Sequence, residues 1–280
     1  MSIRLSSILV IVACVSQIIK SDITKPVKSS VVREDHEQYE WLVNAPPNFH
    51  EHLSKNGTMI DAKSDAELMA KFESERQFYL DNPCSHTDGE VIDAVDHYFW
   101  GMTHGLSMEL GGLDGSHSTR SMTASFEEKF KWKRIIVEGN PLYRQGLVKK
   151  SPLAFGVNAV ICSDPTIMHY SSREYIGGLL EFMSQKFLRD FHTAIYRNCT
   201  PHGNLSSVDF TKFSDVIPVA CIPLSQVLHR AHVKHINYFV LDVEVRETKS
   251  NVSDLPNILK PYTPRALKNK ISIRLLNFIQ

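Results

Sequence analysis

The 280-residue chain has no surplus of charge of either sign, because 31 lysines and arginines balance 31 aspartates and glutamates. Proteins that bind nucleic acids by neutralising phosphates need a basic surplus, so no nucleic-acid partner is expected. No block of like charge is long enough to form a polybasic tail. Apolar residues make up 42% of the chain, which is enough for the core of one large domain or two small ones.

Three common catalytic patterns are also missing. The histidines at 229, 232 and 235 have no neighbouring cysteines or ladder of carboxylates, so no metal site is predicted. Ser116 lacks the glycines two positions before and after it that form a hydrolase nucleophile elbow, and this disfavours acyl hydrolysis. A complete glycine-rich dinucleotide fingerprint is absent, and this disfavours a nicotinamide-dependent oxidoreductase.

The N-terminus carries a short apolar run over residues 8–15, preceded by Arg4 and followed by Lys20. The run is shorter than the roughly 20 apolar residues that cross a bilayer as a helix. It predicts a cleaved signal peptide over residues 1–20, with an uncleaved membrane anchor and a buried helix as alternatives. We therefore expect a protein of the secretory pathway, in the endoplasmic reticulum or Golgi lumen, secreted, or held by a single membrane anchor.

Glycosylation sequons and cysteines agree with this route. Four sequons begin at Asn56, Asn198, Asn204 and Asn251. If Cys14 leaves with the signal, four cysteines remain, and they allow three disulfide pairings: Cys84, Cys162, Cys199 and Cys221. Cys162 and Cys221 have apolar neighbours, so the alternative is that both are small core residues.

Residues 21–100 are predicted to form a polar arm followed by helices. Residues 21–56 have no hydrophobic period and contain several prolines, which favours a linker. A helix is predicted over residues 65–79, where Ser64 can cap its start and Asn82-Pro83 ends it. A second helix is predicted over residues 90–99.

Residues 101–280 alternate between short apolar runs and helical segments. Strands are predicted over residues 106–110, 134–138, 156–162 and 236–242, with helices between them. This alternation is typical of a parallel sheet that is covered on both faces. Residues 163–220 break the rhythm and predict an insertion on the ligand side of the sheet, with one helix over 173–191. A last strand is predicted over 271–278.

The most informative segment is the sequence ELGGLDG at residues 109–115, directly after the first predicted strand. Glycines allow a sharp turn and let a ligand approach the backbone, and ligands of open α/β sheets lie beyond the carboxyl ends of strands. Glu109 and Asp114 would repel a pyrophosphate, so this loop favours a cationic ligand.

Two further acids end predicted strands. Glu138 follows Asp114 by about 24 residues, close to where nucleoside-binding folds place an acid that accepts hydrogen bonds from ribose hydroxyls. Asp242 and Glu244 follow the run at residues 238–241 and could orient a ligand amine or act as a general base. The alternative for each is an acid at a strand end that faces water.

Five segments in order resemble FkbM-type methyltransferase domains, most closely the animal Star-like subgroup, whose members are secretory-pathway membrane proteins. They are ELGGLDG (109–115), KWKRIIVEGNP (131–141), NAVIC (158–162), CIPL (221–224) and YFVLDVE (238–244). The resemblance covers residues 106–244, roughly half the chain.

The resemblance implies a Rossmann-like S-adenosylmethionine-dependent methyltransferase fold with a doubly wound, mostly parallel sheet, and O-methyl transfer to a hydroxyl of a glycan or small molecule. It assigns the methionine end of S-adenosylmethionine to Glu109, Gly111, Asp114 and Gly115. By the same resemblance Glu138 holds the ribose, Ser163 and Asp164 contact adenine, and Asp242 faces the methyl donor and acceptor, where it is the expected base.

The sequence departs from the family pattern at its C-terminal side. Glu244 is followed by Val245 where the family has glycine, and one further strand is expected where a complete fold has about three. We therefore expect a fold that lacks its last strands, either trimmed or altered at its end. The alternative function is a Star-like non-catalytic trafficking protein, with a degenerate methyltransferase fold and a protein cargo as its partner.

Overall fold

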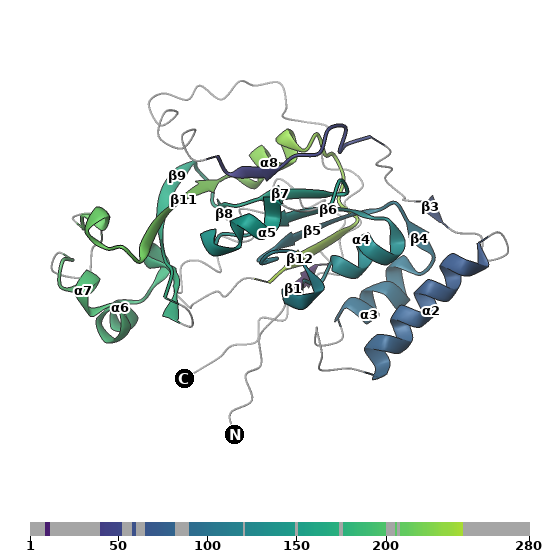
Figure 1. The fold of residues 1–280 in the computed structure, drawn as a ribbon, viewed down its shortest axis with the longest axis horizontal. Helices are drawn as coiled ribbons and strands as arrows, with labels where there is room; N and C mark the ends of the chain where they lie inside the picture. Colours follow the sequence, from purple (N-terminus) through teal and green to yellow (C-terminus); the bar gives the residue numbers. More distant parts are fainter. Residues whose placement is uncertain are drawn as a thin grey trace, which may run out of the picture.

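The computed structural model describes residues 9–11, 40–51, 58–59, 65–81, 90–119, 121–148, 151–173, 176–199, 205 and 208–242. Within these ranges the chain has the α/β architecture that the sequence predicts. A six-stranded mixed sheet lies at the centre, and a four-stranded sheet extends from one end of it (Figure 1). The last strand predicted over 271–278 lies outside the described residues, as does Glu244.

Four parallel neighbours form the middle of the six-stranded sheet, in the order β12-β5-β6-β7. Their bounds are β5 Leu106–Leu110, β6 Lys133–Val137, β7 Ala154–Val157 and β12 Tyr238–Leu241. The predicted parallel arrangement is confirmed for these strands. The chain crosses from β5 to β6 on one side and places β12 on the other side of β5, so the strand order reverses between β5 and β12.

Antiparallel strands close both edges of this sheet. β2 (Leu42–Asn44) pairs with β7, and β1 (Leu9–Ile11) pairs with β12. The prediction of an irregular linker over residues 21–56 was wrong at β2. Asn158 N–H donates to the carbonyl of Trp41 (2.8 Å), and this hydrogen bond joins the segment to the sheet. β1 falls inside the segment predicted to be a signal peptide or anchor, and the remainder of residues 1–39 lies outside the described residues.

Side chains of alternate strand residues pack on opposite faces of the sheet, as the pleat requires. On one face Met108, Ile135 and Phe239 pack against α8 (Leu224–Arg230). On the other face Tyr238 and Val240 join an aromatic cluster with the helices α2 (Ala66–Asp81), α3 (Glu90–Ala94) and α4 (Ala124–Phe130). Burial on both faces explains why the strands read as nearly continuous apolar runs.

The two helices predicted before the first central strand agree with the structure. The helix predicted over 65–79 is α2, and Asp65 caps its start by accepting the N–H of Leu68 (3.0 Å). The helix predicted over 90–99 is α3 followed by a π-helical turn. The shorter elements on this side are that turn (Val95–Phe99), β3 (Thr58–Met59), β4 (Met102–Thr103), the 3-10 turns His117–Thr119 and Pro141–Tyr143, and α5 (Arg144–Val148). In the described part of the chain, no helix is both long and apolar enough to cross a membrane.

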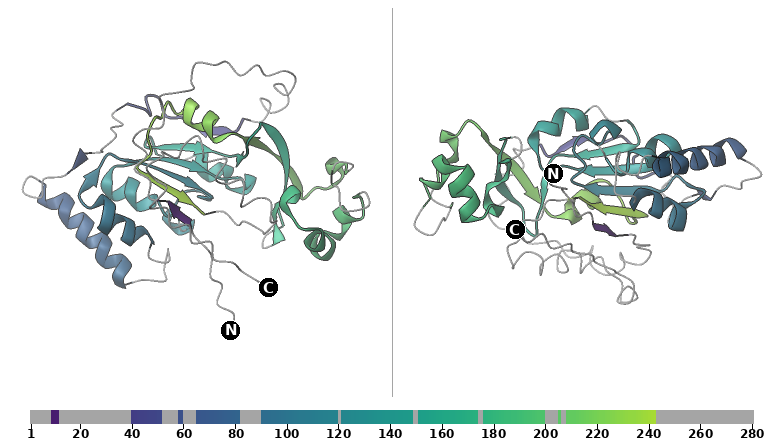
Figure 2. Two further views of the ribbon diagram at one scale, coloured as in Figure 1. Left: turned by 180° about the vertical axis from the view of Figure 1, so that it is seen from behind. Right: turned by 90° about the horizontal axis from the view of Figure 1, so that it is seen from below.

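The insertion forms a projection that we call the arm, built from the strands β9, β10 and β11 and the helices α6 and α7. Its far end and helix α2 lie at opposite ends of the molecule (Figures 1 and 2). The four-stranded sheet has the order β10-β9-β11-β8. The elements are β8 Val160–Ile161, β9 Thr166–Ser171, β10 Gly178–Leu179, α6 Gln185–Phe191, α7 Thr193–Tyr196 and β11 Val216–Ile222, with 3-10 turns at Leu180–Phe182 and Phe210–Lys212.

Two predictions for this region were wrong. The single helix over 173–191 is a short strand, a 3-10 turn and α6, because Gly178 has φ 141° and such a backbone cannot continue a helix. The single strand over 156–162 divides at Asn158–Ala159: β7 belongs to the central sheet, whereas β8 pairs with β11. The strand β11 was not predicted, and it contains Pro218. The proline is tolerated because β8 pairs only with Cys221 and Ile222, so no β8 residue lies opposite Pro218.

The aromatic cluster under the sheet gives a stability prediction. Phe126 is fully buried and its ring contacts Phe99, Trp132 and Tyr238. Phe126→Ala should lower the free energy of unfolding by about 3–5 kcal/mol, because a large buried side chain is replaced by a cavity. Urea denaturation monitored by circular dichroism measures this change.

Leu142→Ala is the matched control, because Leu142 is 59% exposed. It should change the free energy of unfolding by less than about 0.5 kcal/mol. Equal losses in the two variants would contradict the packing described for Phe126.

Candidate functional site at the carboxyl edge of the parallel strands

The register of the sheet brings the predicted site residues to one edge. Leu241, Leu110 and Val137 are paired across β12, β5 and β6, so the residues that follow them lie at the same level. These residues are Asp242, Gly111 and Glu138. The ladder continues for one rung beyond the strands: Asp242 N–H donates to Leu110 O (2.9 Å), Gly111 N–H to Val137 O (2.8 Å) and Glu138 N–H to Val157 O (3.0 Å). The reversal of strand order between β5 and β12 lies at the same place.

The loop after β5 turns through three residues with positive φ. Gly111 has φ 85°, Leu113 φ 52° and Gly115 φ 73°. A side chain at Gly115 would also meet the Cδ1 atom of Ile136 at 2.5 Å. Glycine is therefore favoured at Gly115 by its positive φ, and any side chain there would also displace the Ile136 side chain.

Most amides of this loop donate to acceptors within the chain. Gly111 and Gly112 N–H donate to Val137 O, Gly115 N–H to Gly112 O (2.7 Å), and Leu113 N–H to the Glu138 carboxylate (2.9 Å). Sites that hold a pyrophosphate instead turn loop amides toward the ligand. In the observed loop these four amides are instead directed to acceptors within the chain.

Glu109 lies beneath the loop rather than at its surface. Its carboxylate is 1% exposed and accepts three hydrogen bonds from the segment before α4: Ser121 Oγ (2.6 Å), Met122 N (2.8 Å) and Thr123 Oγ1 (2.6 Å). Glu109 therefore joins the end of β5 to the start of α4. Its contribution to the site is to hold the loop in place.

Arg134 on β6 is the buried cation that balances Glu109. Its Nη2 lies 3.9 Å from Glu109 Oε2 and donates to Gly115 O (2.9 Å), and its Nη1 donates to Glu127 Oε2 (2.9 Å). The side chain is 2% exposed. Arg134 thus connects β6 to the end of the glycine loop and to α4.

Glu138 connects the glycine loop to the end of β6. Its Oε2 accepts the N–H of Leu113 (2.9 Å) and its Oε1 accepts the N–H of Asn140 (2.6 Å). Burial raises its pKa above the ordinary value of 4.5, these two N–H groups oppose the shift, and the charges of Glu109 and Asp242 add to it. Glu138 is therefore close enough to both other acids for their charges to act on it.

The remaining predicted residues lie around this edge. Asp242 is half-buried at the end of β12. Asp114 is half-buried in the loop, where its Oδ1 accepts Ser116 N–H (2.9 Å), Ser116 Oγ (2.6 Å) and Thr119 Oγ1 (2.5 Å). Ser163 and Asp164 are exposed and follow β8, with Ser163 Oγ donating to Asp164 Oδ2 (2.9 Å).

Two acids act electrostatically on Glu138. The charges of Glu109 and Asp242 both disfavour its ionised form, and Arg134 contacts Glu109, Glu127 and the loop carbonyl. A positive charge near Asp242 would relieve the mutual repulsion of these acids. The described residues contain no group of three side chains that could hold a metal ion.

Two residues important for this edge were missed by sequence reasoning. Arg134 had a detectable signal, since it is a charged residue in phase with the buried Ile136 of the same strand. Asn158 had none: its Nδ2 donates to Glu138 O (2.8 Å) and Asn140 O (3.2 Å), and this role depends on the chain leaving β7 for a different sheet.

The chain matches no protein-family model, no curated protein and no solved structure. The resemblance to FkbM-type domains therefore rests on the five motifs alone.

The contact between the loop and α5 gives a second prediction. A Cβ atom on Gly146 would lie 2.4 Å from the Cβ of Asp114, so helix α5 or the loop must move to accept one. Gly146→Ala should lower the free energy of unfolding by about 1–3 kcal/mol, the usual cost of overpacking. Chemical denaturation measures the loss.

Gln145→Ala is the control on the same helix, because Gln145 is exposed. It should leave stability within about 0.5 kcal/mol of the wild type. A stabilised Gly146→Ala protein would mean that the loop does not approach α5 as described.

The raised pKa of Glu138 gives a third prediction. The folded state holds the Glu138 proton more tightly than the unfolded chain, so ionisation of this group costs stability as pH rises from its ordinary pKa of 4.5 through the raised value. The difference in unfolding free energy between the wild type and Glu138→Gln should therefore favour the wild type more at acidic than at neutral pH. A pH series of denaturation curves for both proteins measures it.

Only the change of this difference with pH is diagnostic, because the glutamine amide cannot accept both backbone N–H groups and shifts the absolute stability. A difference that moves in favour of the wild type as pH rises would show that the carboxylate is stabilised, not penalised, by its surroundings.

Proposed function

We propose that the chain is an S-adenosylmethionine-dependent O-methyltransferase of the secretory pathway, with the β12-β5-β6-β7 sheet as the core of a Rossmann-like methyltransferase fold. The observation that carries the proposal is the register that brings Gly111, Glu138 and Asp242 to one edge at the reversal of strand order. The order β7-β6-β5-β12 matches the third, second, first and fourth strands of a doubly wound nucleotide-binding sheet.

The chemistry of the edge agrees with the charge of this cofactor. S-adenosylmethionine carries a sulfonium cation and a nucleoside without phosphates. The acids Glu138 and Asp242 at this edge favour a cation. The loop amides donate to acceptors within the chain, so a ligand without phosphates suits this loop. Glu138 ends the strand next to the glycine loop, where an acid accepts ribose hydroxyls through its remaining lone pairs.

In this proposal the protein's own groups do three things. The loop at residues 111–115 and Glu138 bind and orient the cofactor, which supplies the methyl group. Asp242 orients the acceptor hydroxyl of a glycan or small molecule and takes its proton. Methyl transfer from a sulfonium depends mainly on the alignment of donor and acceptor, so one carboxylate is sufficient as a base.

A second candidate is a Star-like non-catalytic trafficking protein that kept this fold and binds a protein cargo. The hydrogen bonding of Glu138 favours this candidate, because both of its carboxylate oxygens already accept backbone N–H groups. In this role the acids would serve to hold the loop alone.

Calorimetry with S-adenosylmethionine separates the two candidates. The full chain, produced in a secretory host, should bind the cofactor with micromolar affinity. Glu138→Ala and Asp114→Ala should each weaken binding by about tenfold or more, since hydrogen bonds to charged groups are worth roughly 1.5–3 kcal/mol.

Glu181→Ala is the matched control, because this acid lies in the arm and pairs with His169. It should bind like the wild type. Absence of detectable binding by a folded, glycosylated preparation would overturn the methyltransferase proposal and leave the non-catalytic candidate.

A further inference from the structure

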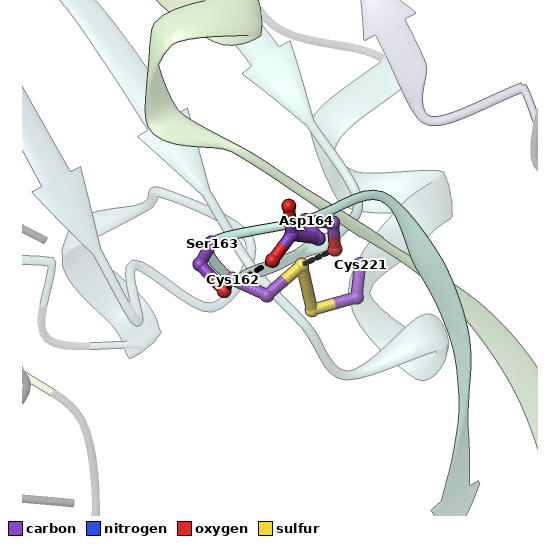
Figure 3. Close-up of a disulfide and its surroundings, with 4 residues drawn as sticks. All are labelled: Cys162, Ser163, Asp164 and Cys221. Carbon is purple, nitrogen blue, oxygen red and sulfur yellow. Dashed lines mark hydrogen bonds between the residues drawn. A yellow bond between two sulfur atoms is a disulfide. The ribbon is translucent and has the colours of Figure 1, made fainter. Parts of the chain in front are cut away.

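Cys162 and Cys221 form a disulfide where the arm meets the central sheet (Figure 3). Their Cα atoms are 5.7 Å apart, and 59 positions separate them in the sequence. Cys221 is fully buried in β11, whereas Cys162 is half-buried directly after β8. The bridge therefore links the start and the end of the arm.

The disulfide holds the loop in which Ser163 and Asp164 lie. Figure 3 shows these two residues beside the sulfur atoms, and Sγ of Cys162 is 2.9 Å from the carbonyl oxygen of Asp164. Cys162 N–H also donates to Ile222 O (3.1 Å), so one backbone hydrogen bond and one disulfide bond tie the same residue to β11. Ser163 and Asp164 are otherwise exposed, and the hydrogen bond between their own side chains does not attach them to the sheet.

β8 also contacts the segment that follows Glu138. A Cβ atom on Gly139 would lie 3.1 Å from Cγ2 of Val160, so the two backbones approach closely there. Asn158, two residues before Val160, donates to the carbonyl of Glu138. The position of β8 therefore determines how far the loop after it lies from Glu138.

We infer that the Cys162–Cys221 disulfide positions the adenosine end of the ligand site, by fixing the Ser163–Asp164 loop to β11. The identity of the ligand in this inference rests on the proposed function. The attachment of the loop to β11 does not depend on that function. It makes ligand affinity dependent on the redox state of the protein. Dithiothreitol opens the bridge by giving two electrons and two protons to the sulfur pair, which yields two cysteine thiols and the cyclic disulfide of the reagent.

Two measurements on the full chain test the two parts separately, using Cys162→Ala/Cys221→Ala. Hydrogen exchange of the Cys162 backbone amide should become at least about tenfold faster in this variant, because its bond to Ile222 O is no longer held by the bridge. The amides of β5 should remain as protected as in the wild type, which shows that the central sheet is still folded. Cys199→Ala, which removes an arm cysteine outside this bridge, is the matched control and should leave both regions unchanged.

Calorimetry with adenosine and with S-adenosylmethionine then tests the ligand part. Both affinities should fall by about tenfold in the double variant, the usual effect of losing one hydrogen-bonded contact. Dithiothreitol should weaken binding to the wild type to the same extent and have no effect on the variant.

The outcomes are distinct. Unchanged exchange at Cys162 overturns the fastening, whatever the ligand. Faster exchange with unchanged adenosine affinity overturns the positioning role. A wild type that binds neither ligand overturns the proposed function and the ligand part together, while the exchange result still decides whether the bridge fastens the loop.

Discussion

The described fold depends most on the buried ion pair between Arg134 and Glu109. It lies under the glycine loop, and its hydrogen bonds reach β5, β6, the loop carbonyl of Gly115 and the start of α4. A buried charge that loses its partner typically costs about 3–5 kcal/mol, so neither residue can change alone without disturbing everything that the pair connects. Through Gly115 O the pair also supports a loop in which three residues have positive φ.

The Arg134–Glu109 pair also distinguishes the role of Glu109 from that of Glu138, which the sequence alone did not. Glu109 and Glu138 both end or nearly end a strand, and both looked like ligand-binding acids. Alternation places the Glu109 side chain on the face that α4 covers, close to Arg134, whereas Glu138 comes one residue after β6. Glu109 holds the segment before α4, and Glu138, which is 7% exposed, accepts the N–H groups of Leu113 and Asn140.

The parallel core and its helices could be predicted because their cause is local: continuous apolar strands, helical periods and a capped helix start. The register of Gly111, Glu138 and Asp242 followed from strand ends alone. The division of the chain at Asn158–Ala159, the edge strand β2 and the strand β11 could not be predicted, because each depends on a partner distant in sequence. For Arg134, burial could be predicted from its position in the strand, but its hydrogen-bond partners could not.

The arm begins at Cys162, directly after β8, and ends at Cys221 in β11, with the two Cα atoms only 5.7 Å apart. The arm is therefore an insertion with fixed ends, and its length does not alter the distance between those ends. Since longer loops with fixed ends cost little additional entropy, residues could be added or removed at the far end of the arm without moving β8 or β11. The arm is thus the part of this molecule that is free to diversify in size and surface while the carboxyl edge of the sheet stays the same.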